Sequence, residues 1–419
     1  MVMNLKKYIA TLLLISLLVF VTGCGEGSKS KGLEISSDVQ FDKDDYQKIV
    51  AANNQLGFQL LKESSEDEKG NIFISPMSLF MALSMVYNGA DGETKEEIAK
   101  VLHVEGMGVS ELNKANASLM SKLHSHSKQI QLNVANSIWL NDEFHFQTDF
   151  AQSNSDYFNA EIQEITINDR KSPQKINAWV KKSTNGKIDK IVDESLEADL
   201  VAMLINAIYF KGDWTHKFDK EQTQKQSFHL KDGTTKDVSL MALNENLAYF
   251  ETDKFQAVSL PYGDEAMSMK VFLPKENYSV EELEGMFTVD SWKQWNSSFI
   301  KQIGTILLPK FQLEFEVLLN DILKHLEMTT AFDNNANFTK MVQENNPLFI
   351  SEVKQKTFID VNEEGTEAAA VTSISLDTAS APAASFFMEV NRPFFIVITD
   401  DTTGTILFLG SISNPTESK

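Results

Sequence analysis

The sequence predicts two β-strands, Glu352–Asn362 and Phe394–Thr399, separated by roughly 30 residues that show no core-building pattern. Most of the side chains between the two strands are small, hydroxylated or weakly apolar. A connection of this length inside a compact domain is uncommon, and it is usually either functional or disordered. A solvated surface loop is the simplest interpretation, but the order of the side chains favours a second one.

That order is one-sided when the segment from Thr366 onward is read with the period of two that a strand requires. The first face would be small near its start and apolar further on, and it would carry Thr366, Ala368, Ala370, Thr372, Ile374 and Leu376. The second face would carry every charge, and it comprises Glu367, Ala369, Val371, Ser373, Ser375 and Asp377. No proline lies between Pro347 and Pro382, so every amide up to Ala381 could join a ladder. The pattern indicates a loop that can enter a sheet.

The start of this loop resembles the hinge of inhibitory serpins, the serine-protease-inhibitor family. The matching residues are Glu363, Glu364, Gly365, Thr366, Glu367, Ala368, Ala369 and Ala370. Further matches in family order are 71–78, 206–214, Leu308 to Phe311, Asn391 to Phe394 and Phe408 to Gly410. The resemblance covers about Asp44 to Pro415. It implies an α+β serpin fold with largely antiparallel sheets, surrounding helices and an exposed reactive-centre loop.

The body of the chain predicts the same class of fold from its own patterns. Ser75 and Pro76 form a cap and first-turn pair that opens a buried helix over Met77–Tyr87. Thr94 is expected to cap the next helix. Strands are expected at 131–140, 200–210, 257–261 and 267–273. Because helices and strands do not alternate as βα units, the sheets should be largely antiparallel.

The resemblance implies roles for several other residues. A polar cluster that controls sheet opening would consist of Ser75, Ser78, Asn206 and Gln355, the last standing where the family often has histidine. Trp214 would lie at the top of the sheet where the loop enters, and Lys310 would pair with Glu363. Each residue also has an ordinary structural interpretation, as a helix cap, a buried amide or a core indole.

The family's counting from the hinge places the scissile bond between Ala379 and Ser380, which leaves 14 residues to Pro393. Neighbouring bonds up to Ala381 remain alternatives. Cleavage at Leu376, or at Phe386 or Phe387, would give an insert of unsuitable length, so we expect substrate behaviour there.

The N-terminus predicts a processing segment over residues 1–23. Lys6 and Lys7 precede an apolar run that is too short to span a bilayer comfortably. The run ends in Val21-Thr22-Gly23-Cys24, which resembles a bacterial lipobox, and Cys24 is the one cysteine of the chain. An incidental cysteine after an ordinary signal peptide is the alternative. We expect lipid on Cys24, a flexible tether over 24–43 and one serpin domain over 44–419.

Composition excludes several functions. The formal net charge of −21 argues against nucleic acid or anionic lipid as an electrostatic partner. No hydrolase, nucleotide-binding or zinc-protease motif occurs, so we expect no enzyme activity and no cofactor. His124 and His126 are two positions apart and would face different sides of a helix, so no metal site is expected.

The resemblance therefore implies a secreted suicide-substrate inhibitor that forms a covalent acyl complex with its target. Ala379 suits elastase-like or subtilisin-like serine proteases, and papain-like cysteine proteases are a further target class. The inhibitor is expected to be a monomer, anchored through Cys24 to the outer face of a bacterial cell membrane. Two alternatives remain: a non-inhibitory serpin-fold binding protein, and an acidic lipoprotein that binds ligands or peptides.

Overall fold

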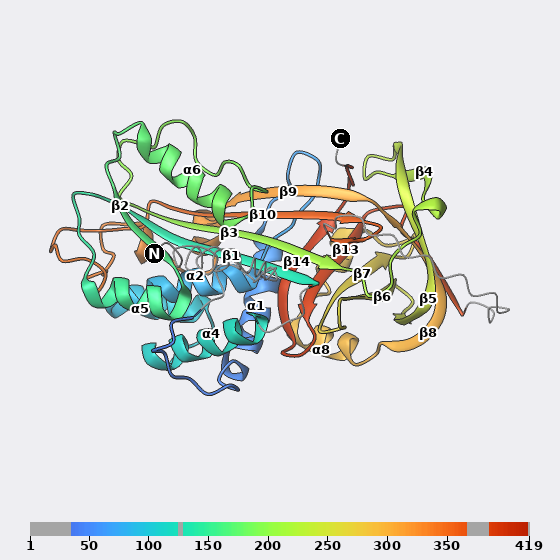
Figure 1. The fold of residues 1–419 in the computed structure, drawn as a ribbon, viewed down its shortest axis with the longest axis horizontal. Helices are drawn as coiled ribbons and strands as arrows, with labels where there is room; N and C mark the ends of the chain where they lie inside the picture. Colours follow the sequence, from blue (N-terminus) through green and yellow to red (C-terminus); the bar gives the residue numbers. More distant parts are fainter. Residues whose placement is uncertain (1–34, 125–128, 367–384, 418–419) are drawn as a thin grey trace, which may run out of the picture.

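The computed structural model describes residues 35–124, 129–366 and 385–417. In this part of the chain, a six-stranded sheet lies between α6 on one face and a group of helices that includes α1, α2, α4 and α5 on the other (Figure 1). An eight-stranded sheet occupies the opposite end of the molecule. Helices and strands follow each other along the chain without regular βα alternation, as the sequence predicts.

The six-stranded sheet has the order β2-β1-β3-β11-β10-β9. Its strands are β2 (Glu161–Ile165), β1 (Ile130–Asn141), β3 (Ala202–Asp213), β11 (Gly365–Thr366), β10 (Glu352–Asn362) and β9 (Phe311–Leu318). The predicted strand at 352–362 is confirmed with the same bounds, and β1 and β3 confirm the predictions at 131–140 and 200–210.

The eight-stranded sheet has the order β12-β8-β5-β6-β7-β13-β14, and β4 pairs with β5. Its strands are β4 (Gln224–His229), β5 (Thr235–Glu251), β6 (Phe255–Tyr262), β7 (Met267–Pro274), β8 (Ile300–Pro309), β12 (Phe386–Glu389), β13 (Phe394–Asp400) and β14 (Thr405–Ile412). Most pairs are antiparallel, as predicted, but β1–β2, β3–β10 and β8–β12 are parallel.

Helices cover both sheets. They are α1 (Gln47–Glu63), α2 (Pro76–Gly89), α3 (Gly92–Val101), α4 (Val109–His124), α5 (Thr148–Phe158), α6 (Lys171–Ser183), α7 (Val280–Glu284), α8 (Val289–Asn296) and α9 (Asn320–His325). Within the described residues, no helix is both long and apolar enough to cross a membrane.

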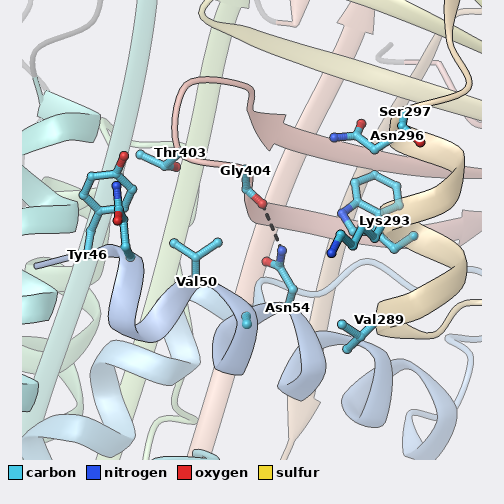
Figure 2. A pocket seen from close by; sticks show the side chains of 12 residues that line it. Tyr46, Val50, Asn54, Val289, Lys293, Asn296, Ser297, Thr403 and Gly404 are labelled. Carbon is cyan, nitrogen blue, oxygen red and sulfur yellow. Dashed lines mark hydrogen bonds between the residues drawn. The ribbon is translucent and has the colours of Figure 1, made fainter. Parts of the chain in front are cut away.

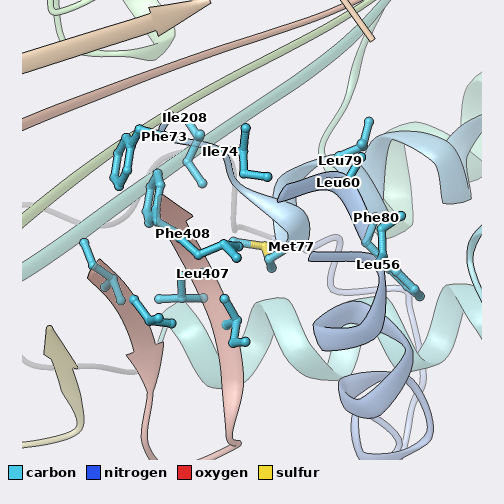
Figure 3. Packing of buried hydrophobic residues seen from close by; sticks show 14 of the residues in the cluster. Leu56, Leu60, Phe73, Ile74, Met77, Leu79, Phe80, Ile208, Leu407 and Phe408 are labelled. Atoms are coloured by element: carbon cyan, nitrogen blue, oxygen red, sulfur yellow. The ribbon is translucent and has the colours of Figure 1, made fainter. Parts of the chain in front are cut away.

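The helix α2 is buried along nearly its whole length, behind the six-stranded sheet. It begins as predicted, because Pro76 occupies its first turn and the Ser75 side chain accepts a hydrogen bond from the Ser78 amide at 3.3 Å. The main hydrophobic core surrounds it, and Figure 3 shows Phe73 stacked on Phe408 with ring centroids 5.1 Å apart. This core fills the space between the two sheets and α1.

A second, smaller core lies on the other face of the six-stranded sheet, beneath α6. Trp139, Tyr209 and Phe358 from three different strands meet Ile176 and Val180 of α6 there. Both faces of the sheet's central strands are therefore buried, and side chains on either face of an added strand would enter a packed environment.

Two sequence predictions need correction. Thr94 does not cap α3: the helix begins at Gly92 after Asp91, and the buried Thr94 hydroxyl accepts a hydrogen bond from the Asn337 amide at 2.9 Å. The connection from 363 to 393 is also not without secondary structure, because β11 and β12 lie at its two ends. The first prediction was wrong because the turn before α3 ends earlier than expected, at Asp91. The second was wrong because β11 and β12 are too short to show a strand period in the sequence.

Residues 35–43 belong to the predicted tether, but they contact the folded body. The Ser36 amide donates to the Asp156 carbonyl at 3.2 Å, and the Ser118 hydroxyl donates to the Lys43 carbonyl at 3.0 Å. The predicted signal segment 1–23 and Cys24 lie outside the described residues.

Candidate inhibitory site: the loop hinge and the sheet seam

The seam is the junction of β3 and β10 in the middle of the six-stranded sheet. We call the end near Met203 and Glu352 the lower end of the seam, and the end near Gly212 and Val361 the upper end. At the lower end the two strands pair directly and in parallel, from Met203 with Glu352 to Tyr209 with Phe358. At its upper end they separate, and β11 lies between them, antiparallel to both. A strand that continued β11 down the seam would pair antiparallel with β3 and β10 and would replace their parallel pairing.

Gly365 and Thr366, the two hinge residues that form β11, are thus already inside the sheet of the uncleaved chain. The sequence analysis places Thr366 at the start of a strand that forms after cleavage; the structure corrects this, because Thr366 is opposite Gly212 and Val361. The part still to be added begins at Glu367.

Close backbone contact explains glycine at 365. A Cβ atom on Gly365 would lie 2.2 Å from the Gly212 carbonyl oxygen, a separation that no other residue tolerates. Thr366 follows with its side chain fully buried, and its hydroxyl is 2.7 Å from the hydroxyl of Tyr262. Burial raises the pKa of Tyr262, so this phenol remains a neutral hydrogen-bonding group.

Trp214 holds the backbone of the hinge from one side. Its indole Nε1 donates to the Asn362 carbonyl at 2.9 Å, and its amide donates to the Glu364 carbonyl at 3.0 Å. The indole ring stacks on Tyr262 with centroids 4.4 Å apart. The structure thus places Trp214 where the resemblance expects it, at the upper end of the seam.

Two carboxylates of the hinge are paired with cations. Glu363 lies 2.9 Å from Lys310, as the resemblance implies, and it also accepts from the Thr223 hydroxyl at 2.9 Å. Burial acts to raise the pKa of Glu363, but Lys310, a backbone hydrogen bond and Thr223 outweigh it, so the net shift is downward. The carboxylate is therefore the stable form at neutral pH.

Glu364 lies between Lys217 at 2.6 Å and Lys220 at 2.8 Å, a pairing that the sequence analysis missed. Hydrogen bonds from Lys217 and then Lys220 lower the pKa of Glu364. The signal available in the sequence was the pair of lysines three to six residues after Trp214, but nothing fixed which acid they face.

The predicted opening cluster is brought together at the lower end of the seam. Gln355 accepts from the Ser75 amide at 2.9 Å, and it donates to the Ser75 carbonyl at 2.9 Å and to Asn206 Oδ1 at 2.7 Å. Asn206 donates in turn to the Ser78 hydroxyl. All four residues are buried, so the cluster ties β3 and β10 to each other and to α2.

Asn136 is a fifth member that the sequence analysis missed. It lies opposite Asn206 in the β1–β3 ladder, and its Oδ1 accepts from Asn206 Nδ2 at 2.5 Å. Asn136, Asn206 and Gln355 therefore form one row of amides across three adjacent strands. The predicted strand 131–140 contains Gln131, Asn133 and Asn136, and nothing in the sequence distinguishes Asn136 from the other two amides. The seam cluster below means Ser75, Ser78, Asn136, Asn206 and Gln355.

The remaining predicted site residues lie outside the described residues: Cys24, Glu367, Ala368, Ala369, Ala370, Ala379 and Ser380. Of the alternative cleavage positions, Phe386 is 6% exposed and stacks on Tyr249 with centroids 4.1 Å apart, which does not suit a protease subsite. Phe387 is 57% exposed.

Away from the seam, a hollow of about 590 Å³ lies between α1, α8 and the turn that joins β13 to β14 (Figure 2). Asn54 donates across it to the Gly404 carbonyl at 2.9 Å, and Tyr46, Val50 and Lys293 form part of its wall. In the described ranges, no three acidic, histidine or cysteine side chains are placed to hold a metal ion.

The two sheets, the seam with a strand begun in it and the paired hinge define an α+β protein with the serpin fold. The family model described as serpin (serine protease inhibitor) matches residues 51–415. The chain belongs to the serpin family, whose members are generally protease inhibitors and not enzymes.

Relatives from distant organisms share this body. Iripin-1 of Ixodes ricinus is 34% identical over 374 residues, which cover 88% of this chain and 95% of Iripin-1. An uncharacterized serpin-like protein of Methanosarcina mazei is 31% identical over 377 residues, which cover 88% of this chain and 87% of that protein. The native crystal structure of the thermophilic serpin tengpin matches with a TM-score of 0.82 and 33% identity, over 92% of this chain and all of tengpin.

Proposed function

We propose that this protein is a suicide-substrate inhibitor of serine proteases. The nucleophilic hydroxyl of the target attacks the Ala379 carbonyl carbon, and the bond from Ala379 to the Ser380 nitrogen breaks. The Ser380 amine leaves with a proton, and Ala379 stays bound to the protease as an ester. The freed loop then enters the seam as an added strand and carries the protease with it. Loop insertion of this kind is known for serpins.

One observation carries the proposal: β11 is a strand already begun in the seam. If the loop continues in its register, each step forward on the loop is one step back on β3 and one on β10, counted from the pairs of Thr366 with Gly212 and Val361. Leu376 then falls opposite Ala202, the first residue of β3. The segment from Gly365, which pairs with Asp213, to Leu376 matches the 12 residues of β3.

The same register places the one hydroxylated residue of the inner face beyond Thr366, Thr372, opposite both Asn206 and Gln355. The other inner-face residues, Ala368, Ala370, Ile374 and Leu376, would face the main core. The one polar position of this stretch of the inner face, Thr372, would thus meet the row of amides in the seam. This match supports insertion in this register over a loop that stays outside the sheet.

Insertion would be favourable because the added strand gains ladder hydrogen bonds of about 0.5–1.5 kcal/mol each. Burial of Ile374 and Leu376 would add about 1.5–3 kcal/mol each. The trapped acyl ester is the kinetic consequence, since the protease is moved before water can hydrolyse the ester.

The small Ala379 supports elastase-like or subtilisin-like targets, and papain-like cysteine proteases as a further class, but not trypsin-like enzymes, whose pocket acid pairs with Arg or Lys. The variant Ala379→Arg should gain trypsin and lose elastase. This loop position is expected to alter target choice with little effect on the fold.

A denaturing gel of the protein with subtilisin and with pancreatic elastase tests the proposal. We expect a band of the summed mass that survives denaturant, and a released C-terminal peptide whose mass begins at Ser380. A peptide that begins beyond Pro382 would contradict the placement of the bond. Complete absence of a complex would favour a serpin-fold binding protein.

We also propose that Cys24 carries a lipid that anchors a secreted monomer to the outer face of a bacterial membrane. The support is the lipobox-like segment that ends at this cysteine. Changing Cys24 to Ala should move the protein from the detergent phase to the aqueous phase, and an unchanged partition and mass would contradict the anchor.

A further inference from the structure

A single residue, Lys310, joins the two sheets at the upper end of the seam. It lies between Pro309, the last residue of β8, and Phe311, the first residue of β9. Its side chain is paired with Glu363 of the hinge, so the position of its backbone decides where this cation stands. The Lys310 amide donates to the Ser239 carbonyl of β5 at 2.9 Å. A contact that fixes Ser239 or the start of β9 therefore acts on the hinge.

The segment after β14 makes such contacts on both sides of Lys310. On one side, the Gln312 amide donates to the Thr416 carbonyl at 2.6 Å, and the Thr416 hydroxyl donates to the Gln312 carbonyl at 3.3 Å. On the other side, Glu417 accepts from the Ser239 amide at 2.9 Å. Figure 1 shows this part of the chain, in dark red, beside β9. The clamp below means Thr416 and Glu417.

The clamp bonds to backbone groups at the free edge of a sheet. β9 is the last strand of the six-stranded sheet, and a strand in that position has amides and carbonyls on one side without a neighbouring strand. Gln312 pairs with Asp360 of β10 within the sheet, and it bonds to Thr416 outside the sheet. The upper end of β9 is therefore held from two sides, and so is the backbone that leads to Lys310.

Charge strengthens the contact at Glu417. The Lys225 ammonium of β4 lies 2.7 Å from the same carboxylate oxygen that accepts from the Ser239 amide. Burial acts to raise the pKa of Glu417, but the hydrogen bonds from Lys225 and from Ser239 outweigh it, so the net shift is downward. The carboxylate is therefore the acceptor at neutral pH, and an ionised acceptor makes a stronger hydrogen bond than a neutral one.

We propose that Thr416 and Glu417 are positioning residues for the hinge: they hold Lys310 where it pairs with Glu363, and so keep β11 in the seam before cleavage. The inference rests on the proposed function, because the position of the hinge affects inhibition only if the loop inserts. Without the clamp, Lys310 would move away from Glu363 more often, and a buried carboxylate would lose its cation. The hinge would then leave the seam more often, and insertion would start later, in competition with hydrolysis of the acyl ester.

Two backbone amides report how often the hinge leaves the seam of the intact protein. The Trp214 amide donates to the Glu364 carbonyl, and the Phe218 amide donates to the Glu363 carbonyl, each at 3.0 Å. Such an amide exchanges its hydrogen when the bond opens, so deuterium uptake over residues 212–220, measured by mass spectrometry, follows the hinge directly. The amides of α4 are the reference, because α4 packs against α1, α2 and α5.

Truncation is the direct test of the clamp. In a chain that ends after Pro415, we expect residues 212–220 to exchange about tenfold faster than in wild type, with α4 unchanged. A chain that ends after Glu417 keeps the clamp, so it is the matched control and should exchange at the wild-type rate. Glu417→Ala is a milder variant that should also exchange faster. Glu417→Gln should restore most of the wild-type rate, because its amide oxygen can still accept from the Ser239 amide.

A second background shows whether the clamp acts through Lys310. Lys310→Met alone should speed exchange over residues 212–220, because Glu363 loses its cation. Ending this variant after Pro415 should then add less than about twofold, since the two changes act on one contact. A full additional tenfold increase would show that the clamp does not act through Lys310, and would overturn the proposal.

Inhibition supplies a readout that does not depend on exchange. The chain that ends after Pro415 should consume about twice as much inhibitor for each subtilisin molecule trapped, because slower insertion lets more of the acyl ester hydrolyse. Wild-type exchange over residues 212–220 in both this chain and Glu417→Ala would overturn the clamp and leave the proposed function intact. Equal acceleration of residues 212–220 and of α4 would also overturn it, since the loss would then be one of general stability. A wild type that traps no protease would contradict the proposed function, and the exchange rates would still decide whether the clamp positions the hinge.

Discussion

The two ends of the seam between β3 and β10 are in different states of the same rearrangement. At the upper end the strands are separated, β11 lies between them, and the hinge carboxylates are paired with three lysines. At the lower end the strands pair directly, and buried amides join them to α2. The upper end already has the arrangement that insertion would produce, and the lower end does not.

The difference indicates where an inserting loop meets resistance. A loop that continues β11 breaks no hinge contact at the upper end, but it must separate Gln355 from Asn206 at the lower end. Both side chains are fully hydrogen-bonded in the closed seam. When the seam opens, their buried donors and acceptors lack partners until Thr372 of the inserting loop reaches them. The seam cluster is therefore the expected barrier, and β11 is the expected starting point.

The largest expected effect is at the upper end. Thr366→Arg places a charge where the hydroxyl is fully buried beside Tyr262, at a cost of several kcal/mol. The hinge should leave the seam, and the protein should become a substrate without a denaturant-stable complex. Thr366→Val is the control, since it loses the hydrogen bond alone, at about 1 kcal/mol. A wild-type yield of complex from Thr366→Arg would refute the role of β11.

The next effect is at the lower end. Gln355→Leu removes the partner of Asn206 Oδ1 and of the Ser75 amide, and it should lower the free energy of unfolding of the intact protein by about 3 kcal/mol. Gln224→Leu on the exposed β4 should change it by less than about 0.5 kcal/mol. Denaturant titration of both variants measures the difference, and equal values would show that the seam cluster contributes no stability.

A smaller effect should appear after cleavage only. Thr372→Val removes the hydroxyl that the register places between Asn206 and Gln355, so the loop-cleaved protein should lose about 1 kcal/mol in guanidinium unfolding while the intact protein stays unchanged. Thr378→Val, which the register places beyond the end of β3, is the control. Equal changes in the two cleaved variants would refute this register.

The smallest effect concerns the paired hinge and its pH dependence. Glu364→Gln removes the pairing with Lys217 and Lys220, which are 40% and 53% exposed, so its cost at pH 7 should not exceed about 1 kcal/mol. Because the pKa of Glu364 is lowered in the folded state, its ion pairs stabilise the fold at pH values above its ordinary pKa of 4.5. This stability is lost as the pH falls through the pKa of Glu364 in the folded state. The difference in melting temperature from wild type should shrink as the pH falls below 4.5 and vanish below the lowered pKa of the folded state. Exposed Glu143→Gln should show no such trend.

The sequence alone predicts the long strands, and the family resemblance implies four of the five seam residues and the Glu363–Lys310 pair, because long apolar runs and a multi-residue motif each constrain the chain strongly. Strand β10 is confirmed over Glu352–Asn362, and Gln355 meets Asn206 as implied. What the sequence does not predict depends on contacts between distant segments. Lys217 and Lys220 could face any acid, and Asn136 joins the amide row only through the register of β1 on β3.

The two-residue strand β11 is the instructive failure. No periodicity can identify a strand of this length, and its position depends on the close contact between Gly365 and Gly212. The sequence therefore describes a loop able to enter the sheet, but only the structure tells how far it has entered before cleavage.

Distances across the sheet, measured between pairs of spin labels before and after loop cleavage, test the account most directly. One pair, at Gln131 and Gln312, spans the upper end of the seam, and the other, at Gln163 and Leu318, spans the lower end; both are placed in a Cys24→Ala background. Cleavage should lengthen the lower distance by about 5 Å, one strand spacing, and leave the upper distance unchanged. Two unchanged distances would contradict insertion, and two equal increases would contradict the presence of β11 in the sheet of the uncleaved protein.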